Sequence, residues 1–309
     1  RVPLGLIASI YESRPNVTID IAALCLKSGN ACVLRGGREA VNSNTLLAAI
    51  VTDALTANGL PGEAVQLIRN PDRTLVAELL RLNDLIDLIV PRGGKPLIER
   101  VRDEASMPVV AGGIGICHTY VDGTANIAMA VDIVDNAKTR RISICNALDV
   151  ILLHRDAAAE FLPALAERWG GTVEIRADDA SLSTLQETGA NAIAVGPDDY
   201  DTEFLAMRCA LHIVDDLDAA IQHIVDHWSG HSEAIVTNDY HNAERFLNEV
   251  DASAIFVNTS TQFNDGGQFG LGAEVGISTG KMHARGPMGL RELTSYKWIV
   301  RGNGQIRPD

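Results

Sequence analysis

The chain has 309 residues, of which 46% are hydrophobic and 21% charged, so it is long enough for two ordinary domains with sizeable cores. Its formal net charge of -14, with no basic tract to offset it, argues against nucleic acid and anionic membranes as partners. No apolar run approaches the ~20 residues that span a bilayer. Five cysteines without a Cys-x-x-Cys pair are typical of reduced thiols, which predicts a cytoplasmic protein.

The first 115 residues alternate between apolar runs and longer amphipathic stretches. The apolar runs predict strands over residues 4–11, 31–35, 65–68, 85–90 and 108–111. The amphipathic stretches predict helices over residues 17–27, 42–57, 73–82 and 94–102, with Asn44 as the cap of the second helix. The chain starts directly in a strand-like run at Arg1, so we expect that an N-terminal segment is absent.

Alternating strands and helices indicate a parallel sheet covered on both faces, which binds ligands at the carboxyl ends of its strands. The first 115 residues are therefore a candidate nucleotide-binding domain. They contain neither a Gly-x-Gly-x-x-Gly sequence nor a P-loop, so no standard dinucleotide fingerprint is present.

A glycine cluster at residues 112–115 predicts a hinge into a second domain, which alternates in the same way. Its predicted helices cover residues 124–138, 157–168, 219–228 and 242–250, and its predicted strands cover 148–154, 233–236 and 254–258. A glycine-rich loop spans 266–280, and a last strand-like run spans 294–301. We expect domains at 1–115 and 116–284, with a C-terminal return at 285–309.

Cys145 lies between a predicted helix and a predicted strand, in the segment NAKTRRISICN. A cysteine on such a loop is able to reach solvent. The nearby side chains of Lys138, Arg140 and Arg141 favour a thiolate, which is the form that attacks carbonyl carbons. Position alone leaves two equal interpretations, a nucleophile and a buried structural cysteine. The other four cysteines lie in apolar runs and are expected in the core.

Long segments along the whole chain resemble the sequences of one known family. The segment NAKTRRISICNALDVILLH resembles the nucleophile motif of gamma-glutamyl phosphate reductases, a branch of the aldehyde dehydrogenase superfamily. The family's cofactor domain, second nucleotide turn and interdomain hinge are similar to RVPLGLIASIYESRPNVTIDIAALCLKSGNACVLRGG, VPRGGKPLI and AGGIGICHTYVD. Its C-terminal signature is similar to VNTSTQFNDGGQFGLGAEVGIST and KMHARGPMGLRELTSYKWIVRGNGQIR. The resemblance implies an aldehyde dehydrogenase-like α/β fold with two parallel-sheet domains, and it implies Cys145 as the nucleophile.

The hinge lacks a carboxylate. The resemblance implies a contrast with hydrolytic aldehyde dehydrogenases, which carry a Glu-Leu-Gly-Gly-Lys motif there whose Glu activates the water that cleaves the thioester. Residues 111–115 read Ala-Gly-Gly-Ile-Gly. This favours acyl-phosphate chemistry, because exchange of phosphate for thiolate requires no such base. A base from elsewhere in the chain, and a CoA-acylating enzyme, stay open as alternatives.

The resemblance also implies a cofactor site. Arg35 stands where superfamily members carry a Lys that touches the cofactor, and Arg38 stands where NAD-preferring relatives often carry a Glu for the ribose 2'-hydroxyl. A cation at that position favours the 2'-phosphate of NADP(H), with a merely solvated Arg38 as the alternative. The turn after residue 90 opens a helix suited to the pyrophosphate, and Glu203 resembles the Glu that positions the nicotinamide ribose, although a surface Glu is nearly as good an interpretation. The expected cofactor residues are Arg35, Gly36, Gly37, Arg38, Arg92, Gly93, Gly94 and Glu203.

An anionic acyl phosphate requires cations and fixed hydrogen-bond donors. The candidates are Arg14 and Asn16 in the segment ESRPN, with Arg140 and Arg141 beside the nucleophile. A structural salt bridge is an equal alternative for any single arginine. Asn146 is expected to act with Cys145, whose backbone N–H contributes to an oxyanion hole.

The histidines at positions 223, 227 and 231 fall at helical spacing, which suggests a zinc site. Trp228, Ser229 and Gly230 are expected to end the helix before His231, so no metal site is predicted. His231 matches a family motif near the active site and is a candidate substrate contact, while ordinary packing or surface roles are favoured for all three.

The resemblance implies NADPH-dependent reduction of L-glutamyl 5-phosphate to L-glutamate 5-semialdehyde, the second step of proline biosynthesis. Residues 296–300 resemble the superfamily strand that pairs with another subunit, so a homodimer or larger assembly is expected. Functional coupling to glutamate 5-kinase is also expected. The alternatives are another aldehyde dehydrogenase and a non-catalytic nucleotide-binding protein, in which Cys145 would be unreactive.

Overall fold

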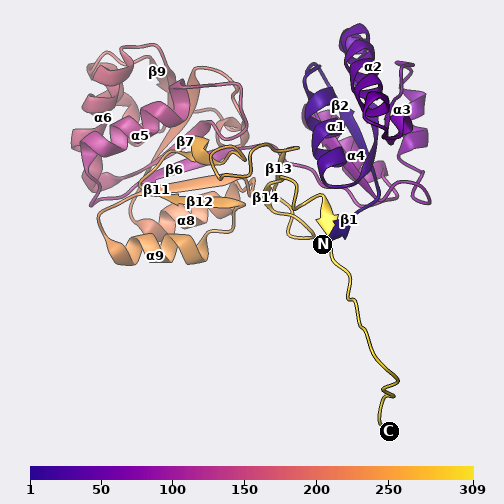
Figure 1. Cartoon of the computed structure of the whole chain (residues 1–309). Coiled ribbons are helices and arrows are strands. Elements are labelled where there is room, and N and C mark those ends of the chain that lie inside the picture. Colours follow the sequence, from indigo (N-terminus) through magenta and orange to yellow (C-terminus); the bar gives the residue numbers. More distant parts are fainter. The chain divides into compact units, whose positions relative to one another are not determined.

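A computed structural model describes residues 1–309 and divides the chain into two compact units. The first unit holds residues 1–110 and 288–309, and the second holds residues 111–287 (Figure 1). Residues 111–115 therefore fall in the second unit, and the C-terminal residues from 288 onward return to the first. Each unit is built on a sheet of parallel strands, which confirms the predicted α/β class.

The first unit has a four-stranded parallel sheet in the order β4-β3-β2-β5. The strands are β2 (Leu6–Tyr11), β3 (Ala31–Arg35), β4 (Val65–Leu67) and β5 (Leu88–Arg92). The helices that connect them are α1 (Val17–Lys27), α2 (Val41–Ala57), α3 (Thr74–Leu79) and α4 (Lys95–Glu104), with short 3-10 turns η1 (Arg38–Ala40) and η2 (Gly62–Ala64). The chain runs outward from β2 to β4 and then returns to place β5 on the other side of β2. This reversal makes the carboxyl ends of β2 and β5 the switch point at which such sheets bind ligands.

Two expectations for the first unit are wrong. Asn44 does not cap α2, because Ala40 holds the cap position; Asn44 is buried inside the helix and accepts a hydrogen bond from Thr18 Oγ1 at 3.2 Å. Residues 108–111 form no strand beyond one bridge between Ile89 and Val109. Pro108 has no N–H to donate, and the glycines that follow end the extended run.

The C-terminal run is also shorter than expected. Only β15 (Thr294–Ser295) pairs within the chain, antiparallel to β1 (Val2–Pro3). The residues that follow have no regular structure, and Tyr296, Trp298 and Val300 are 72%, 88% and 91% exposed.

The second unit has a seven-stranded parallel sheet in the order β12-β11-β6-β7-β10-β8-β9. The strands are β6 (Cys117–Val121), β7 (Leu148–His154), β8 (Glu174–Ala177), β9 (Ala192–Ala194), β10 (Arg208–Val214), β11 (Ser232–Val236) and β12 (Ala254–Val257). The helices are α5 (Ile127–Thr139), α6 (Arg155–Trp169), α7 (Asp179–Glu187), α8 (Leu217–Asp226) and α9 (Tyr240–Glu249). Two 3-10 turns, η3 (Asp199–Asp201) and η4 (Thr261–Phe263), and the short pair β13 (Ile277–Ser278) and β14 (Gly286–Pro287) complete it.

The helices of the second unit begin where short polar side chains cap them. The side chains of Asn126, Asp178, Asp216 and Asp239 accept hydrogen bonds from first-turn N–H groups of α5, α7, α8 and α9. Each such cap contributes about 1 kcal/mol to helix stability. None of the helices in the structure combines the length and the apolar character needed to cross a membrane.

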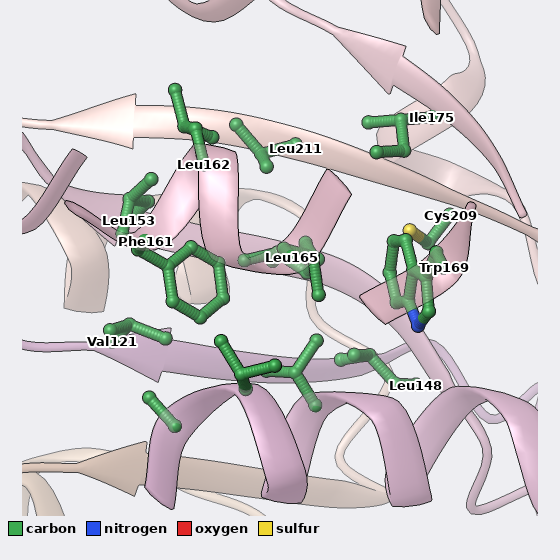
Figure 2. Close-up of a cluster of buried hydrophobic side chains, with 14 of the residues drawn as sticks. Val121, Leu148, Leu153, Phe161, Leu162, Leu165, Trp169, Ile175, Cys209 and Leu211 are labelled. Carbon is green, nitrogen blue, oxygen red and sulfur yellow. The ribbon is translucent and has the colours of Figure 1, made fainter. Parts of the chain in front are cut away.

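The core of the second unit lies on both faces of its sheet. On one face α5 and α6 pack on the central strands, and Figure 2 shows the side chains involved, among them Leu148, Leu153, Phe161, Leu165, Trp169, Cys209 and Leu211. Full burial of each large apolar side chain contributes about 1.5–3 kcal/mol. The other face is covered by α8 and α9 through Ile224 and Phe246. This two-sided core makes β7 a rigid support for the loop that precedes it.

Candidate active site

Cys145 lies on the loop between α5 and β7, which we define as the nucleophile loop (residues 140–146). Cys145 is partly exposed, whereas the other four cysteines are buried, as the apolar runs around them predicted. The loop leads into the amino end of β7, which is a central strand of the seven-stranded sheet. Cys145 is therefore the one cysteine of the five that is not buried.

The segment of residues 115–117, which we call the hinge segment, holds the backbone of Cys145. The thiol of Cys117 donates a hydrogen bond to the carbonyl oxygen of Cys145 at 3.2 Å. Complete burial raises the pKa of Cys117, so this thiol stays protonated and remains a donor. Gly115 approaches from the same segment so closely that an added Cβ would lie 1.9 Å from the Cys145 carbonyl oxygen. Glycine at position 115 is required by this approach.

We expect Gly115→Ala to change the rate at which iodoacetamide alkylates Cys145 by about 10-fold or more, because the added methyl group displaces the Cys145 backbone and so alters the exposure and the thiolate fraction of its thiol. The rate is measured by mass spectrometry of the labelled protein. Gly113→Ala is the matched control, since its Cβ would meet Thr279 Oγ1 at an ordinary 3.5 Å. Equal rates in the two variants would show that the contact with Gly115 does not set the position of Cys145.

Asn146, the other residue expected at the reaction centre, is buried and holds the loop. Its Nδ2 donates to the carbonyl oxygens of Asn264 at 3.0 Å and Gln262 at 3.5 Å. Its Oδ1 is buried without a hydrogen-bond partner. The amide nitrogen is therefore used within the protein, and Oδ1 is the atom that remains for a further hydrogen bond.

The cations near Cys145 differ in exposure. Arg140 and Arg141 are exposed, and Arg140 Nε donates to Gln262 Oε1 at 2.6 Å. Lys138 is fully buried, and its Nζ donates to the carbonyl oxygen of Leu148 at 2.7 Å and lies 3.5 Å from Asp149 Oδ1. Lys138 is thus bonded within the protein, whereas both arginines are exposed.

His231 and Glu203 both lie in the second unit. His231 is 1% exposed, and burial lowers its pKa to about 4, so the ring is neutral at pH 7. Its Nδ1 lies 2.7 Å from Ser232 Oγ and 3.9 Å from Cys117 Sγ, and its Nε2 is buried without a partner. Burial raises the pKa of Glu203 to about 7, reinforced by the charge of Asp149 and opposed by a hydrogen bond from the Gly115 N–H. Glu203 therefore reaches the same hinge residue that contacts Cys145.

A cleft of about 1010 Å³ lies at the carboxyl ends of the strands of the first unit. Arg35, Gly37 and Arg38 line it, together with two arginines that the sequence did not single out, Arg73 and Arg100. Arg35 donates to the carbonyl oxygen of Pro71 at 2.9 Å, and burial, followed by the nearby charge of Arg73, lowers its pKa. The carboxylates of Glu12, Glu39 and Asp72 also line the cleft, so its cations exceed its anions by only one, and the arginines are the groups that favour a ligand with phosphate groups.

The glycines expected in the cofactor site have distinct surroundings. Gly36 is required by close packing, because an added Cβ would lie 1.9 Å from Asn44 Nδ2. Gly93 and Gly94 link Arg92, at the end of β5, to α4. The N–H of Gly94 donates to Glu12 Oε2 at 3.1 Å. A carboxylate of the protein thus lies at the amino end of this helix, where an anion is favoured.

Arg14 and Asn16 are exposed residues of the first unit, at the start of α1. Asn16 Nδ2 donates to Asp20 Oδ2 at 2.8 Å. Arg14 and Asn16 therefore lie in the first unit. The other substrate candidates, Arg140, Arg141 and His231, lie in the second.

The other two histidines of the predicted series are separate from His231. His223 lies on α8 and His227 follows it, with the two rings 4.5 Å apart, whereas His231 precedes β11. His227 Nδ1 lies 2.9 Å from Asp201 Oδ1. No group of three or more His, Cys, Asp or Glu side chains is arranged to hold a metal ion.

Comparison with known proteins assigns the chain to a family. The aldehyde dehydrogenase family matches residues 1–184. A gamma-glutamyl phosphate reductase of Dehalococcoides mccartyi is 59% identical over 309 residues, covering 99% of this chain and 73% of the relative. The chain belongs to the gamma-glutamyl phosphate reductase family. A gamma-glutamyl phosphate reductase of Escherichia coli is 53% identical over 99% of this chain and 74% of its own length.

Solved structures of gamma-glutamyl phosphate reductases and their superfamily agree with the fold. The crystal structure of the enzyme from Thermotoga maritima has a TM-score of 0.94 at 46% identity, over 99% of this chain and 73% of that one. An acetylating aldehyde dehydrogenase from Geobacillus thermoglucosidasius has a TM-score of 0.77 at 20% identity, covering 100% of this chain and 77% of that one, which shows the shared fold alone. The family resemblance and the aldehyde dehydrogenase-like fold predicted from the sequence are confirmed.

Sequence reasoning missed the residues that hold the nucleophile loop. These are Gly115, Cys117, Thr261, Gln262 and Asn264. All five lie in strings that resemble gamma-glutamyl phosphate reductases, but a string does not reveal which of its members contact Cys145. The available signal was a run of polar residues directly after a buried strand, a position that often faces a site.

Proposed function

We propose that this chain catalyses the NADPH-dependent reduction of L-glutamyl 5-phosphate to L-glutamate 5-semialdehyde with release of phosphate, in proline biosynthesis. The proposal is supported most directly by 59% identity to a gamma-glutamyl phosphate reductase over nearly the whole chain. It is also supported by one accessible cysteine on a loop that the hinge segment and the turn η4 hold.

The thiolate of Cys145 attacks the γ-carbonyl carbon of the acyl phosphate, so that a carbon–sulfur bond forms. The backbone N–H of Cys145 stabilises the oxyanion of the tetrahedral intermediate. The bond to the phosphate oxygen breaks, phosphate leaves and a thioester remains. NADPH, when bound, supplies the hydride that reduces this thioester carbonyl. The carbon–sulfur bond then breaks, which releases the aldehyde and restores the thiolate.

In this proposal the first unit supplies all the cofactor residues except Glu203. The cationic cleft suits the phosphates of NADP(H), with Arg35, Gly36, Gly37 and Arg38 at one part of it. Arg92, Gly93 and Gly94 form the second nucleotide turn, and Glu203 of the second unit serves the nicotinamide ribose. The proposed anion-binding residues are Arg14, Asn16, Arg140 and Arg141, with His231 as a neutral polar contact and Asn146 beside the thiol.

The reverse reaction tests the proposal. Purified protein with glutamate semialdehyde, NADP and phosphate should raise the absorbance at 340 nm, and omission of phosphate should abolish this rise. A rise that needs CoA in place of phosphate would indicate the acylating alternative. A rise that needs neither would indicate hydrolysis, for which Glu203, with its pKa of about 7, is the candidate base.

We expect Arg38→Glu to raise the KM for NADP by about 10- to 100-fold, because a hydrogen bond to a charged group is worth about 1.5–3 kcal/mol, and to lower the KM for NAD, because the new carboxylate accepts a hydrogen bond from the ribose 2'-hydroxyl. Initial rates with each cofactor measure the two constants. Arg81→Glu, another exposed arginine that does not line the cleft, is the control. Equal changes for both cofactors would contradict a role of Arg38 at the 2'-phosphate.

The proposal extends to assembly and location. Tyr296, Trp298, Ile299 and Val300 form a run of exposed large apolar side chains, and such a run is typical of a surface that another subunit covers, so we infer a homodimer or larger homo-oligomer. The cytoplasm is the proposed location. Glutamate 5-kinase, which makes the acyl phosphate, is the proposed functional partner.

A further inference from the structure

The nucleophile loop contains no helix or strand, and contacts from a distant part of the chain hold it. The segment Thr261–Asn264, which comprises η4 and the next residue, follows β12 and lies in the same unit as the loop. Ser260 Oγ accepts a hydrogen bond from the Gln262 N–H at 3.3 Å, which caps the start of this turn. Thr261, Gln262 and Asn264 are each at most 4% exposed.

Gln262 contacts the chain on the side that precedes Cys145. Its Nε2 donates to the carbonyl oxygen of Ala137 at 2.7 Å and to that of Arg141 at 3.3 Å. Its Oε1 accepts from Arg140 Nε at 2.6 Å. Because the Arg140 guanidinium only donates and the two carbonyls only accept, this orientation of the amide is the one that satisfies all three bonds.

The segment Thr261–Asn264 also holds Asn146, which follows Cys145 in the chain. Thr261 Oγ1 donates to the Asn146 carbonyl oxygen at 2.7 Å, and Asn146 Nδ2 donates to that of Asn264 at 3.0 Å. One short segment therefore fixes both flanks of the nucleophile. The bond to Arg140 uses Nε, so it leaves the two terminal guanidinium nitrogens, which are donors only, for other acceptors.

We propose that Gln262 is a positioning residue with two separable effects: its Nε2 fixes the backbone that presents Cys145, and its Oε1 aims Arg140 at the phosphate of the substrate. The second effect rests on the proposed function, and the first does not. Gln262 acts through the groups that it holds and touches no reacting atom.

Two isosteric variants separate the effects. Gln262→Met removes both, so we expect alkylation of Cys145 by iodoacetamide to slow by about 10-fold and the KM for phosphate in the reverse reaction to rise by about 10-fold. Gln262→Glu keeps an acceptor for Arg140 but turns an oxygen toward the two carbonyls. It should slow alkylation by about 10-fold and leave the KM for phosphate within about 2-fold. Gln222→Met, on the exposed face of α8, is the control and should change neither quantity.

A double-mutant cycle with Arg140→Ala tests whether the phosphate effect passes through Arg140. The increase in KM caused by Gln262→Met should disappear in the Arg140→Ala background, and additive increases would overturn that half of the proposal. Unchanged alkylation in both Gln262 variants would overturn the other half. If Gln262→Met does not fold, Gln262→Glu still decides the alkylation effect. A wild-type protein that is alkylated at Cys145 but reduces no acyl phosphate would sink the proposed function and leave the alkylation result to stand.

Discussion

We expect Cys145→Ser to lower the rate of the phosphate-dependent reaction by on the order of 10⁴-fold or more, the scale seen when an enzyme loses its nucleophile. The serine hydroxyl has nearly the size of the thiol but remains protonated at neutral pH, so it attacks carbonyl carbon poorly. The measurement is the initial rate at 340 nm with glutamate semialdehyde, NADP and phosphate, compared with that of the wild-type protein.

A binding measurement is the control, because it tests whether Cys145→Ser loses the reaction but keeps the cofactor site. Cys145→Ser should bind adenosine 2',5'-bisphosphate with unchanged affinity, because the cationic cleft belongs to the first unit and Cys145 to the second. Iodoacetamide should label Cys145 in the native wild-type protein, and the buried Cys25, Cys32, Cys117 and Cys209 should stay unlabelled. A variant that keeps a tenth of the wild-type rate would remove the thioester from the mechanism.

The fold was predictable where strands are apolar and helices regular. The ranges of α1, β3 and β7 are those that the sequence predicted. The sequence missed β6, whose residues Cys117–Val121 include His118 and Thr119 and so do not read as an apolar run. His118 is buried there because Glu233 accepts its N–H and lies 2.9 Å from its Nδ1. Only the paired strand β11 supplies that carboxylate, so the sequence of β6 alone does not predict its burial. The elements β8, α7, β9 and β10 were missed as well.

The candidate site was predictable where a motif carries it. The helix and the strand predicted on either side placed Cys145 on a loop, where the structure has it, and the motif singled it out as the candidate nucleophile. The contacts of that loop were not predictable, because Gln262 is 122 residues from Arg140 and only the folded chain brings them together. Arg73 and Arg100 are similar cases, since each comes from a different connection of the first unit to the same cleft. Asn44 shows the opposite error: a local preference for capping lost to a buried hydrogen bond with Thr18.

A cluster of four histidines in the second unit predicts how stability depends on pH. The ring of His223 on α8 lies 5.6 Å from that of His118, 5.1 Å from His212 and 4.5 Å from His227, and 4.8 Å from Tyr200. The three outer histidines lie 2.9 Å from carboxylates, those of Glu233, Asp178 and Asp201. His223 has no such partner, and its Nε2 is buried without a hydrogen bond. Burial, followed by the neighbouring imidazoles, lowers its pKa to about 2.

The sign of the effect follows from this lowered pKa. Below about pH 6.5 the unfolded chain protonates His223 and the folded chain does not, so folding loses stability as the pH falls. The loss is about 1.4 kcal/mol per pH unit, or about 3 kcal/mol between pH 7 and pH 4. Glu203 and Asp149 act in the opposite direction, because burial raises their pKa values to about 7 and about 6 and protonation then favours the folded state. The total pH dependence of the wild-type protein therefore does not isolate His223.

The difference between His223→Gln and the wild-type protein isolates it, because the carboxylate contributions cancel. Urea unfolding followed by tryptophan fluorescence reports on the second unit, which contains the buried Trp169. We expect the free energy of unfolding of His223→Gln, relative to wild type, to rise by about 3 kcal/mol as the pH falls from 7 to 4. The exposed His241 provides the control, since His241→Gln should give a curve parallel to that of wild type. Parallel curves for both variants would mean that His223 is protonated in the folded protein, and the packed histidine cluster would then have to open to admit that charge.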